Sequence, residues 1–479
     1  MKTLVWLRQD LRLSDNPALV FACKQGAVIP LFILDDGAEG EWQMGGAQRW
    51  WLHQSLAALD SDLRERGSAL VLRRGESADV LTTIIAEHGI DSVVWNRRYE
   101  PDIVERDTRI KESLKSRGVY VQSFNATLLN EPWEVQNLSG KPFQVFTPYW
   151  RHCLKRPDPS EPISAPKSIE KPTQWPRTES LAALDLMPRI AWYRRMEQSW
   201  QPGEAGAAKN RKAFVQGHVW GYTETRNLPA IRGTSRLSPH LHFGEVSPRQ
   251  VWHAVKTRGA RVGLLTNEWR TNQFLTELYW REFAYHLLYH FRHTPTQPLR
   301  TEFAQFPWAT NSRHLKAWQG GSTGVPLVDA GMRELWATGW MHNRVRMIAG
   351  SFLVKNLLIA WQDGARWFWD TLLDADLASN TLGWQWCAGC GADAAPYFRI
   401  FNPVSQGEKF DPDGAYVREW VPELAKLQTK FIHAPWDAPP SVLRAASVQL
   451  GKNYPEPIVD LKATRTRALD AYRKMRGTS

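Results

Sequence analysis

The chain contains 479 residues, more than one hydrophobic core ordinarily holds, so at least two domains of unequal size are expected. Its 60 lysines and arginines outnumber the 49 aspartates and glutamates and give a formal net charge of +11. This charge favours either a polyanionic partner such as nucleic acid or a merely basic soluble protein. Four cysteines are too few for a disulfide framework, and the N-terminal residues lack the pattern of a signal peptide. We therefore expect a cytoplasmic protein.

Short β-rich runs alternate with helical patterns over residues 1–130. The runs are 4–7, 27–34, 69–72, 92–95 and 120–124, and the helical patterns are 48–66, 78–88 and 102–117. This alternation predicts an α/β domain with a parallel, five-stranded, Rossmann-like sheet. After the first run the chain has Arg8-Gln9-Asp10-Leu11-Arg12 in place of Gly-x-Gly-x-x-Gly. A dinucleotide bound to this sheet by the usual phosphate turn is therefore not expected.

Residues 131–199 are predicted to form an extended connector, because ten of the thirty prolines fall between Pro132 and Pro188. Residues 200–479 carry helical periodicity and predict a larger, all-α domain. The clearest helical segments are 271–289, 328–336, 342–361 and 366–373. The longest apolar run, 348–361, is interrupted by Lys355 and Asn356 and is too short to span a membrane, so it predicts a buried helix.

Residues 339–402 concentrate aromatic rings, paired acids, arginines and amides, a mixture that suits a flat redox cofactor beside a nucleic-acid base. Sixteen of the 25 tryptophans lie in residues 200–479, although most of these are expected to pack in the core. Asp374 and Asp376 could clamp a cofactor ring or form an ion-pair network with Arg346. Cys387 and Cys390 have the spacing of half a zinc or redox site, but no second pair exists, so no metal is predicted.

Three further groups suggest binding. The turn 233–239 offers hydroxyls and backbone N–H groups that suit a diphosphate, or simply caps a helix. Glu277, Trp280 and Arg281 share one helical face, where they could bind an extruded base or form a surface ion pair beside a packed ring. Asn343 and Met347 lie four apart and could line a half-polar pocket, but Met347 alone is better explained as a core residue.

Taken together, these motifs resemble the photolyase/cryptochrome family, and most of all its microbial members that repair cyclobutane pyrimidine dimers. The resemblance runs from residues 6–16 through 340–344 to 406–410. It implies FAD in the helical domain, active in its reduced form, with Asn380 facing flavin N5 and Arg346 pairing with the acids. The FAD contacts implied are Tyr222, Thr234, Ser235, Arg236, Leu237, Ser238, Phe274, Arg346, Asp374, Ala375, Asp376 and Asn380.

The resemblance also implies light-driven electron transfer to a dimer flipped out of DNA. Glu277 would hydrogen-bond the dimer, and Trp280 and Trp386 would form apolar walls. The remaining lesion and phosphate contacts implied are Asn343, Met347, Gln406, Arg226, Arg281 and Arg344. Asn343 and Met347 stand where six-four photolyases need histidines, which favours the cyclobutane substrate. Trp384, Trp361 and Trp308 match the family's electron relay.

An antenna chromophore in the N-terminal domain is implied by residues 45–51 and 95–101, which resemble members carrying methenyltetrahydrofolate. Met44 stands where the best-known folate pocket has histidine, which leaves a deazaflavin or an empty site as alternatives. We expect a monomer that associates with the nucleoid and needs no obligate protein partner. A cryptochrome-type blue-light receptor is the main rival, although no long polar tail follows the helical domain. A nucleic-acid-binding protein without chemistry would leave the motifs at 374–380 and 234–238 unexplained.

Overall fold

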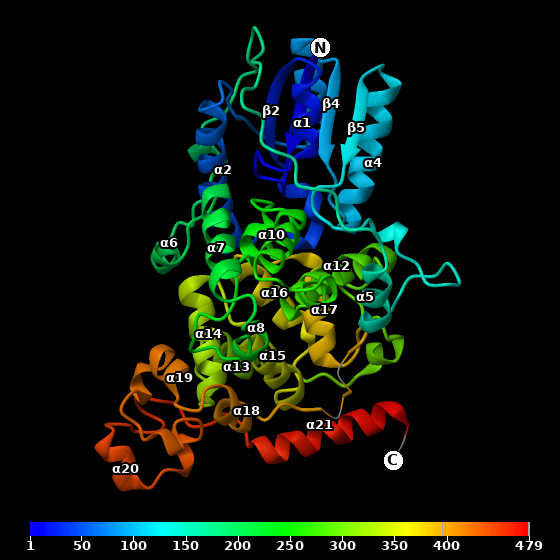
Figure 1. The fold of residues 1–479 in the computed structure, drawn as a ribbon. Helices are drawn as coiled ribbons and strands as arrows, with labels where there is room; N and C mark the ends of the chain where they lie inside the picture. Colours follow the sequence, from blue (N-terminus) through cyan, green and yellow to red (C-terminus); the bar gives the residue numbers. More distant parts are fainter. Residues whose placement is uncertain (395, 398, 478–479) are drawn as a thin grey trace. The chain divides into compact units, whose positions relative to one another are not determined.

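A computed structural model describes residues 1–394, 396–397 and 399–477 (Figure 1). Ala395 and Phe398, two positions of the aromatic-rich segment 339–402, lie outside the described residues. The chain forms two compact units. Unit 1 comprises 1–220, 235–292 and 373–377, and unit 2 comprises 221–234, 293–372 and 378–479. The domain boundaries at 130 and 199, which rest on sequence pattern alone, stay a prediction.

The predicted five-stranded parallel sheet is confirmed, with the strand order β3-β2-β1-β4-β5. The strands are β1 (Lys2–Leu7), β2 (Ala27–Leu34), β3 (Val71–Arg74), β4 (Ser92–Asn96) and β5 (Tyr120–Phe124). Leu4 of β1 sits opposite both Ile29 of β2 and Val93 of β4, so the first strand is central. Continuous apolar runs such as β2 form because both faces of such a sheet are covered.

Four helices follow the strands in turn: α1 (Pro17–Cys23), α2 (Gly46–Arg64), α3 (Ser77–His88) and α4 (Pro101–Ser116). One hydrophobic cluster joins α3 and α4 to the sheet through Leu81, Ile84, Ile110 and Leu114. Trp6 and Trp95 meet edge to face in the same cluster, 5.6 Å between ring centroids. These helices therefore hold the carboxyl ends of the strands in a fixed arrangement.

The proline-rich segment runs along the sheet with little regular structure. The backbone N–H of Val28 donates to Glu170, and that of Glu179 donates to Leu72. Its two short α-helices are α5 (Phe146–Leu154) and α6 (Arg194–Ser199). The other helices of unit 1 are α7 (Glu204–Gly217), α9 (Ser238–His242), α10 (Pro248–Arg261), α11 (Thr266–Arg270) and α12 (Gln273–His290).

Unit 2 is helical, as predicted. Its α-helices are α8 (Tyr222–Thr225), α13 (Ser312–Gln319), α14 (Pro326–Thr338), α15 (Asn343–Ser351), α16 (Trp361–Thr371), α17 (Leu377–Ala388, whose first residue belongs to unit 1), α18 (Pro403–Phe410), α19 (Ala415–Trp420), α20 (Pro440–Ala445) and α21 (Leu461–Arg476). In the described part of the chain, no helix combines the length and apolar character that a membrane crossing requires.

The prediction of one helix over 342–361 was wrong. Helix α15 ends at Ser351 and passes into a π-helical turn, η5 (Phe352–Asn356), and Leu358 then takes a left-handed conformation with φ of 54°. Helix α16 begins afresh at Trp361, five residues before the predicted start at 366. The apolar spacing continues through this turn, so the sequence pattern does not mark the break; within the turn, the Lys355 side chain donates a hydrogen bond to Ala388 at the end of α17, 3.0 Å away.

Candidate functional site

Helix α12 carries the predicted base-binding residues of unit 1. Asn272 caps the helix by accepting a hydrogen bond from the Phe274 N–H at 2.8 Å, which fixes the start of the helix. Glu277 is half-buried and accepts a 2.7 Å hydrogen bond from Gln273. Trp280, one turn later, stacks on Phe146 with ring centroids 3.8 Å apart and an interplanar angle of 10°. A carboxylate and an aromatic plate therefore share one face, as predicted from their spacing.

Arg281 is held within unit 1 by contacts that sequence reasoning missed. Its Nη1 donates to the Thr127 carbonyl at 2.8 Å, and its guanidinium lies over the Tyr285 ring, 4.8 Å from the centroid. These contacts orient Arg281 by packing as well as by charge. Its predicted contact with DNA stays a prediction.

Asp376, in the loop before α17, is a buried carboxylate with several polar neighbours in unit 1. The Tyr285 hydroxyl donates to it, and the His242 ring lies 3.9 Å away. Burial alone raises the pKa of a carboxyl group, but His242, Arg281 and Tyr285 together hold the pKa of Asp376 well below its usual range. Asp376 is therefore an anion at neutral pH.

His242 is a polar group that sequence reasoning did not single out. Both of its ring nitrogens are buried, and Asp376, although 3.9 Å from Nδ1 and electrostatically favourable, is too far away for a normal hydrogen bond. A buried imidazole without partners is costly unless a polar group satisfies it. Next to it, Gln48 of α2 donates to the Ala375 carbonyl and fixes the loop 374–376. This combination of an ionised acid and an unsatisfied imidazole fits the polar portion of a bound cofactor.

The turn before α9 departs from simple helix capping. Arg236 takes a left-handed conformation with φ of 51°, and its guanidinium lies over the Trp200 ring at 5.6 Å. The Leu237 N–H is 3.3 Å from the Ser235 hydroxyl, and α9 begins at Ser238. A strained residue in a hydroxyl-rich turn suits the predicted diphosphate site better than an ordinary cap does. Thr234, the preceding residue, belongs to unit 2.

Two arginines of unit 2 lie close together. The Arg344 side chain donates to Asn227 at 2.8 Å, and burial together with the like charge of Arg226 lowers its pKa. Arg226 in turn lies over the Tyr222 ring at 5.5 Å. Arg344 also stacks on Phe410, in the same helix as Gln406. Neighbouring cations that repel each other favour an anion such as a phosphate between them.

Helix α15 begins at Asn343, which is exposed, and His342 caps the helix start. The Asn343 amide lies 4.0 Å from the Met347 sulfur, so these two side chains are on one face, as predicted. Arg346 donates to the Met341 carbonyl at 2.7 Å. Arg346 belongs to unit 2 and the acids 374–376 to unit 1, so their predicted pairing stays a prediction.

Helix α17 carries Asn380, Trp384 and Trp386 in unit 2. The Asn380 amide donates to the Ala365 carbonyl of α16 at 3.2 Å. Trp384 is 3% exposed and lies on α16 at Gly364, where a Cβ atom would be 2.1 Å from the indole ring. Only glycine permits this approach. Trp386 is half-buried and stacks on Phe401, 6.3 Å away.

The three tryptophans of the predicted relay all belong to unit 2. Trp361 begins α16, one helical turn before Gly364, and is 1% exposed. Ala309 donates its N–H to Leu358 at 2.7 Å, which brings the segment of Trp308 close to the start of α16. Trp308 is half-exposed and packs on Phe306 at 4.4 Å. Trp384 and Trp361 are both buried and Trp308 is partly exposed, so a path from the interior to the surface would end at Trp308.

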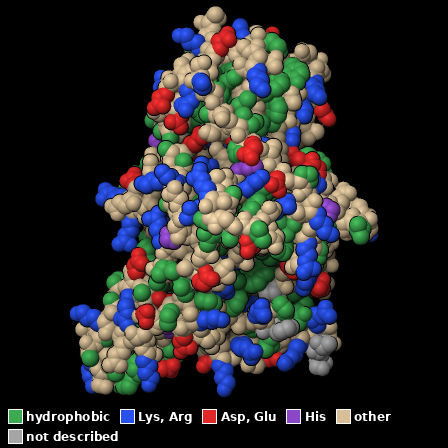
Figure 2. Space-filling model, in the orientation of Figure 1, with side chains coloured by type: hydrophobic (Ala, Val, Ile, Leu, Met, Phe, Trp, Pro, Cys, Tyr) green, Lys and Arg blue, Asp and Glu red, His purple; other side chains and the backbone are tan. Residues whose placement is uncertain are grey.

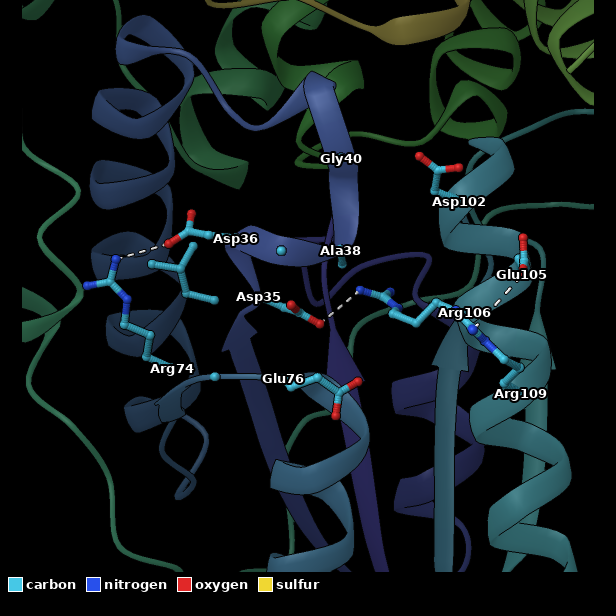
Figure 3. Close-up of a pocket in the computed structure, with 13 residues that line it drawn as sticks. Asp35, Asp36, Ala38, Gly40, Arg74, Glu76, Asp102, Glu105, Arg106 and Arg109 are labelled. Atoms are coloured by element: carbon cyan, nitrogen blue, oxygen red, sulfur yellow. Dashed lines mark hydrogen bonds and ion pairs between the residues drawn. The ribbon is translucent and has the colours of Figure 1, made fainter. Parts of the chain in front are cut away.

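A cavity of about 630 Å³ lies at the carboxyl ends of β2 and β3 (Figure 3). Five carboxylates and three guanidiniums line it, together with Leu34, Gly37, Ala38, Gly40 and Gly75. The charged residues are Asp35, Asp36, Glu76, Asp102, Glu105, Arg74, Arg106 and Arg109. The aromatic residues of the two predicted antenna motifs are not part of this lining: Trp50, Trp51 and Trp95 are buried in the core.

Cys387 and Cys390 are free thiols, and burial raises the pKa of each to about 12. Buried protonated thiols are poor nucleophiles and poor metal ligands.

Comparison with known proteins identifies the family of the chain. The profile of the DNA photolyase domain matches residues 3–167, and that of the FAD binding domain of DNA photolyase matches residues 274–474. The deoxyribodipyrimidine photo-lyase of Agrobacterium fabrum is 49% identical, over 99% of this chain and 98% of that protein. The chain belongs to the photolyase/cryptochrome family. This membership confirms the resemblance found in the sequence.

Both branches of the photolyase/cryptochrome family are among the relatives. Cryptochrome-1 of Arabidopsis thaliana is 42% identical, over 99% of this chain and 70% of that protein. The crystal structure of a bacterial class III photolyase from Agrobacterium tumefaciens has a TM-score of 0.96, at 49% identity, and covers 100% of this chain and 98% of that one. The photolyase fold is therefore confirmed, and the matching FAD-binding domain identifies FAD as the cofactor of the helical domain.

Proposed function

We propose that the protein is a light-driven deoxyribodipyrimidine photolyase that repairs cyclobutane pyrimidine dimers in DNA. The observation that carries this proposal is the 49% identity, over nearly the whole length of both chains, with a deoxyribodipyrimidine photo-lyase. The reduced flavin, when bound, supplies one light-excited electron to the dimer and recovers it after the ring has split. The protein's own residues bind the cofactor and lesion, exclude water and conduct electrons.

The residues proposed to hold FAD fit it on two structural grounds. Asp376 remains ionised despite its burial, and the His242 nitrogens need polar partners, so this loop suits ribityl hydroxyls or ring N–H groups. The strained turn at Arg236 presents hydroxyls and backbone N–H groups to a diphosphate. Asn380, anchored on Ala365, stands one turn before Trp384 and is proposed to face the flavin ring.

Lesion recognition is assigned to α12, α15 and α17. Trp280 and Trp386 offer flat apolar surfaces, Glu277 would accept hydrogen bonds from the bases, and Asn343 and Met347 stand in place of the histidines that six-four repair needs. Arg226 and Arg344 hold phosphates. Because phosphate contacts release counterions, binding should weaken steeply with salt.

The rival function is a cryptochrome-type photoreceptor, because Arabidopsis Cryptochrome-1 is 42% identical to this chain. The deciding experiment follows the loss of dimers from ultraviolet-treated oligonucleotide under blue light and in the dark, after chemical reduction of the bound flavin. Light-dependent loss of dimers supports repair. Bound flavin without such loss would favour the receptor.

Glu277→Ala should lower the repair yield and leave the flavin content unchanged, because the carboxylate faces the lesion and not the cofactor. The measurement is dimers repaired per absorbed photon with saturating substrate, beside flavin absorbance. Gln273→Ala is the control, since it removes the 2.7 Å hydrogen bond to Glu277 but keeps the carboxylate. Equal repair yields in the wild type and in Glu277→Ala would show that the Glu277 carboxylate does not take part in repair.

We infer further that an antenna binds in the cavity of Figure 3 and that methenyltetrahydrofolate fits it better than a deazaflavin does. The five carboxylates of the lining suit the delocalised positive charge on the methenyl bridge of this folate, and the three guanidiniums suit its glutamate carboxylates, whereas the ring of a hydroxylated deazaflavin ionises to an anion. The volume is within the range of small-molecule sites. Asp102 borders the cavity close to Gly40: a Cβ atom added at Gly40 would lie 3.3 Å from Asp102 Oδ2.

Asp102→Lys should therefore reduce the amount of antenna that co-purifies with the protein, because it reverses one charge in the lining. The readout is the absorbance and mass of the chromophore released by heat, set against the FAD content. Glu112→Lys is the matched control, on the same helix but outside the cavity lining. Equal chromophore in all three proteins would place the antenna elsewhere.

A further inference from the structure

The C-terminal helix α21 is the most basic helix that the cofactor and lesion assignments leave unused. It carries six basic side chains and one acidic side chain, Asp470. The basic residues are Lys462, Arg465, Arg467, Arg473, Lys474 and Arg476. This excess of basic over acidic side chains supplies a large part of the formal net charge of +11.

One face of α21 is committed to the body of unit 2. Thr464 and Ala468 are buried, and Tyr472 stacks on Tyr397 with centroids 4.6 Å apart and an interplanar angle of 8°. Arg467 donates to the Asn356 carbonyl at 2.6 Å and so serves as an anchor. The apolar side of this amphipathic helix is therefore already covered.

One exposed side of the helix is cationic. With 3.6 residues per turn, Lys462, Arg465, Arg473 and Arg476 fall within one stripe about 80° wide that borders the buried side of Thr464 and Ala468, and all four are exposed. At 1.5 Å per residue they extend over about 21 Å. Lys and Arg side chains are visible along the stretch of the surface where α21 runs (Figures 1 and 2).

Helix stability does not account for this pattern. Cations in the last turn complement the helix dipole, but Lys462 and Arg465 lie in the first turns, where a positive charge is unfavourable. Asp470 pairs with Arg473 at 3.0 Å, and both side chains are largely exposed, so this contact neutralises little of the row. The row of exposed cations is therefore available to an external anion.

We propose that the outward face of α21 is a second, sequence-independent DNA-binding surface that holds the phosphate backbone of intact duplex. A helix-long row of cations complements duplex DNA, which carries one charge per about 1.7 Å of axis. An anionic membrane is disfavoured, because binding there needs an apolar face to insert and that face of α21 is covered by unit 2. The proposal extends the function proposed above from the lesion to the duplex around it.

The test compares the quadruple variant K462Q/R465Q/R473Q/R476Q with a control that loses the same number of charges on unit 1, K24Q/R64Q/K115Q/R117Q. All eight residues are exposed. Binding of each full-length flavoprotein to an undamaged fluorescent duplex is measured by anisotropy across a range of KCl concentrations. Thermal unfolding and flavin absorbance verify that each variant is folded.

We expect the slope of log affinity against log salt to become shallower by about 3.6 in the α21 variant, since each of the four lost phosphate contacts contributes about 0.9. In the control variant, the slope should change by less than about one. Equal changes in the two variants would overturn the proposal, as would loss of binding to phosphatidylserine vesicles with an unchanged DNA slope. This assay needs no light and no lesion, so its outcome is independent of whether the protein repairs dimers.

Discussion

Trp384→Phe is expected to abolish nearly all photoreduction of the oxidised flavin in the purified protein, while repair persists once the flavin has been reduced chemically. Trp384 is the innermost ring of the proposed relay and lies against Gly364, one turn from Trp361. Phenylalanine preserves the shape but is much harder to oxidise than indole. The measurement is the bleaching of oxidised-flavin absorbance under blue light with an external reductant.

The matched control is Trp318→Phe. Trp318 is also fully buried and lies 6.1 Å from Trp384, but its indole N–H donates to Ala349 and it is not a member of the proposed relay. This variant should lose roughly 1–3 kcal/mol of stability, because the Ala349 carbonyl loses its partner, yet keep its photoreduction rate. If both variants lost photoreduction alike, packing and not electron transfer would be the role of Trp384. Loss of repair together with photoreduction would lead to the same conclusion.

The sheet was predictable because its inner strands β1, β2 and β4 are buried on both faces and therefore appear in the sequence as short apolar runs. The run 27–34 was predicted to the residue for this reason. The helix over 342–361 was not, because apolar spacing continues through the break at η5 and Leu358. Within the break, the Lys355 side chain donates a hydrogen bond to Ala388, 33 residues further along the chain. Local pattern contains no information on that partner.

In the candidate site too, contacts within one helix could be predicted from spacing, whereas contacts between distant segments could not. Glu277 and Trp280 share one helical face, so their spacing alone predicted their juxtaposition. The group formed by His242, Tyr285 and Asp376 comes from three segments, and the Tyr285–Asp376 contact joins residues 91 positions apart. The only local signal for this group was a pair of histidines, His240 and His242, directly after a Ser-Pro helix start. In the antenna motifs the rings of Trp50, Trp51 and Trp95 were instead core residues, because apolar rings suit a pocket and a core equally well.

Asp376→Asn is expected to cost the folded protein about 3 kcal/mol in the free energy of unfolding, because removal of one partner from a buried charged group leaves the others uncompensated. Arg281 and His242 would lose the anion they face, and Tyr285 would keep only a neutral acceptor. FAD affinity should fall as well, since the loop 374–376 is proposed to bind the cofactor. The readouts are urea unfolding of the flavin-free protein and the dissociation constant of added FAD.

The pH dependence of the stability loss in Asp376→Asn distinguishes a charge effect from a packing effect. The folded-state pKa of Asp376 lies below the unfolded value of about 3.9, so its stabilisation is complete above that value and disappears as the pH falls through the folded pKa. The stability gap between wild type and Asp376→Asn should therefore narrow below about pH 4. Asp413→Asn, at an exposed position, should stay within about 0.5 kcal/mol of wild type. A gap that remained constant down to acid pH would show that Asp376 acts through its shape and hydrogen bonds, not through its charge.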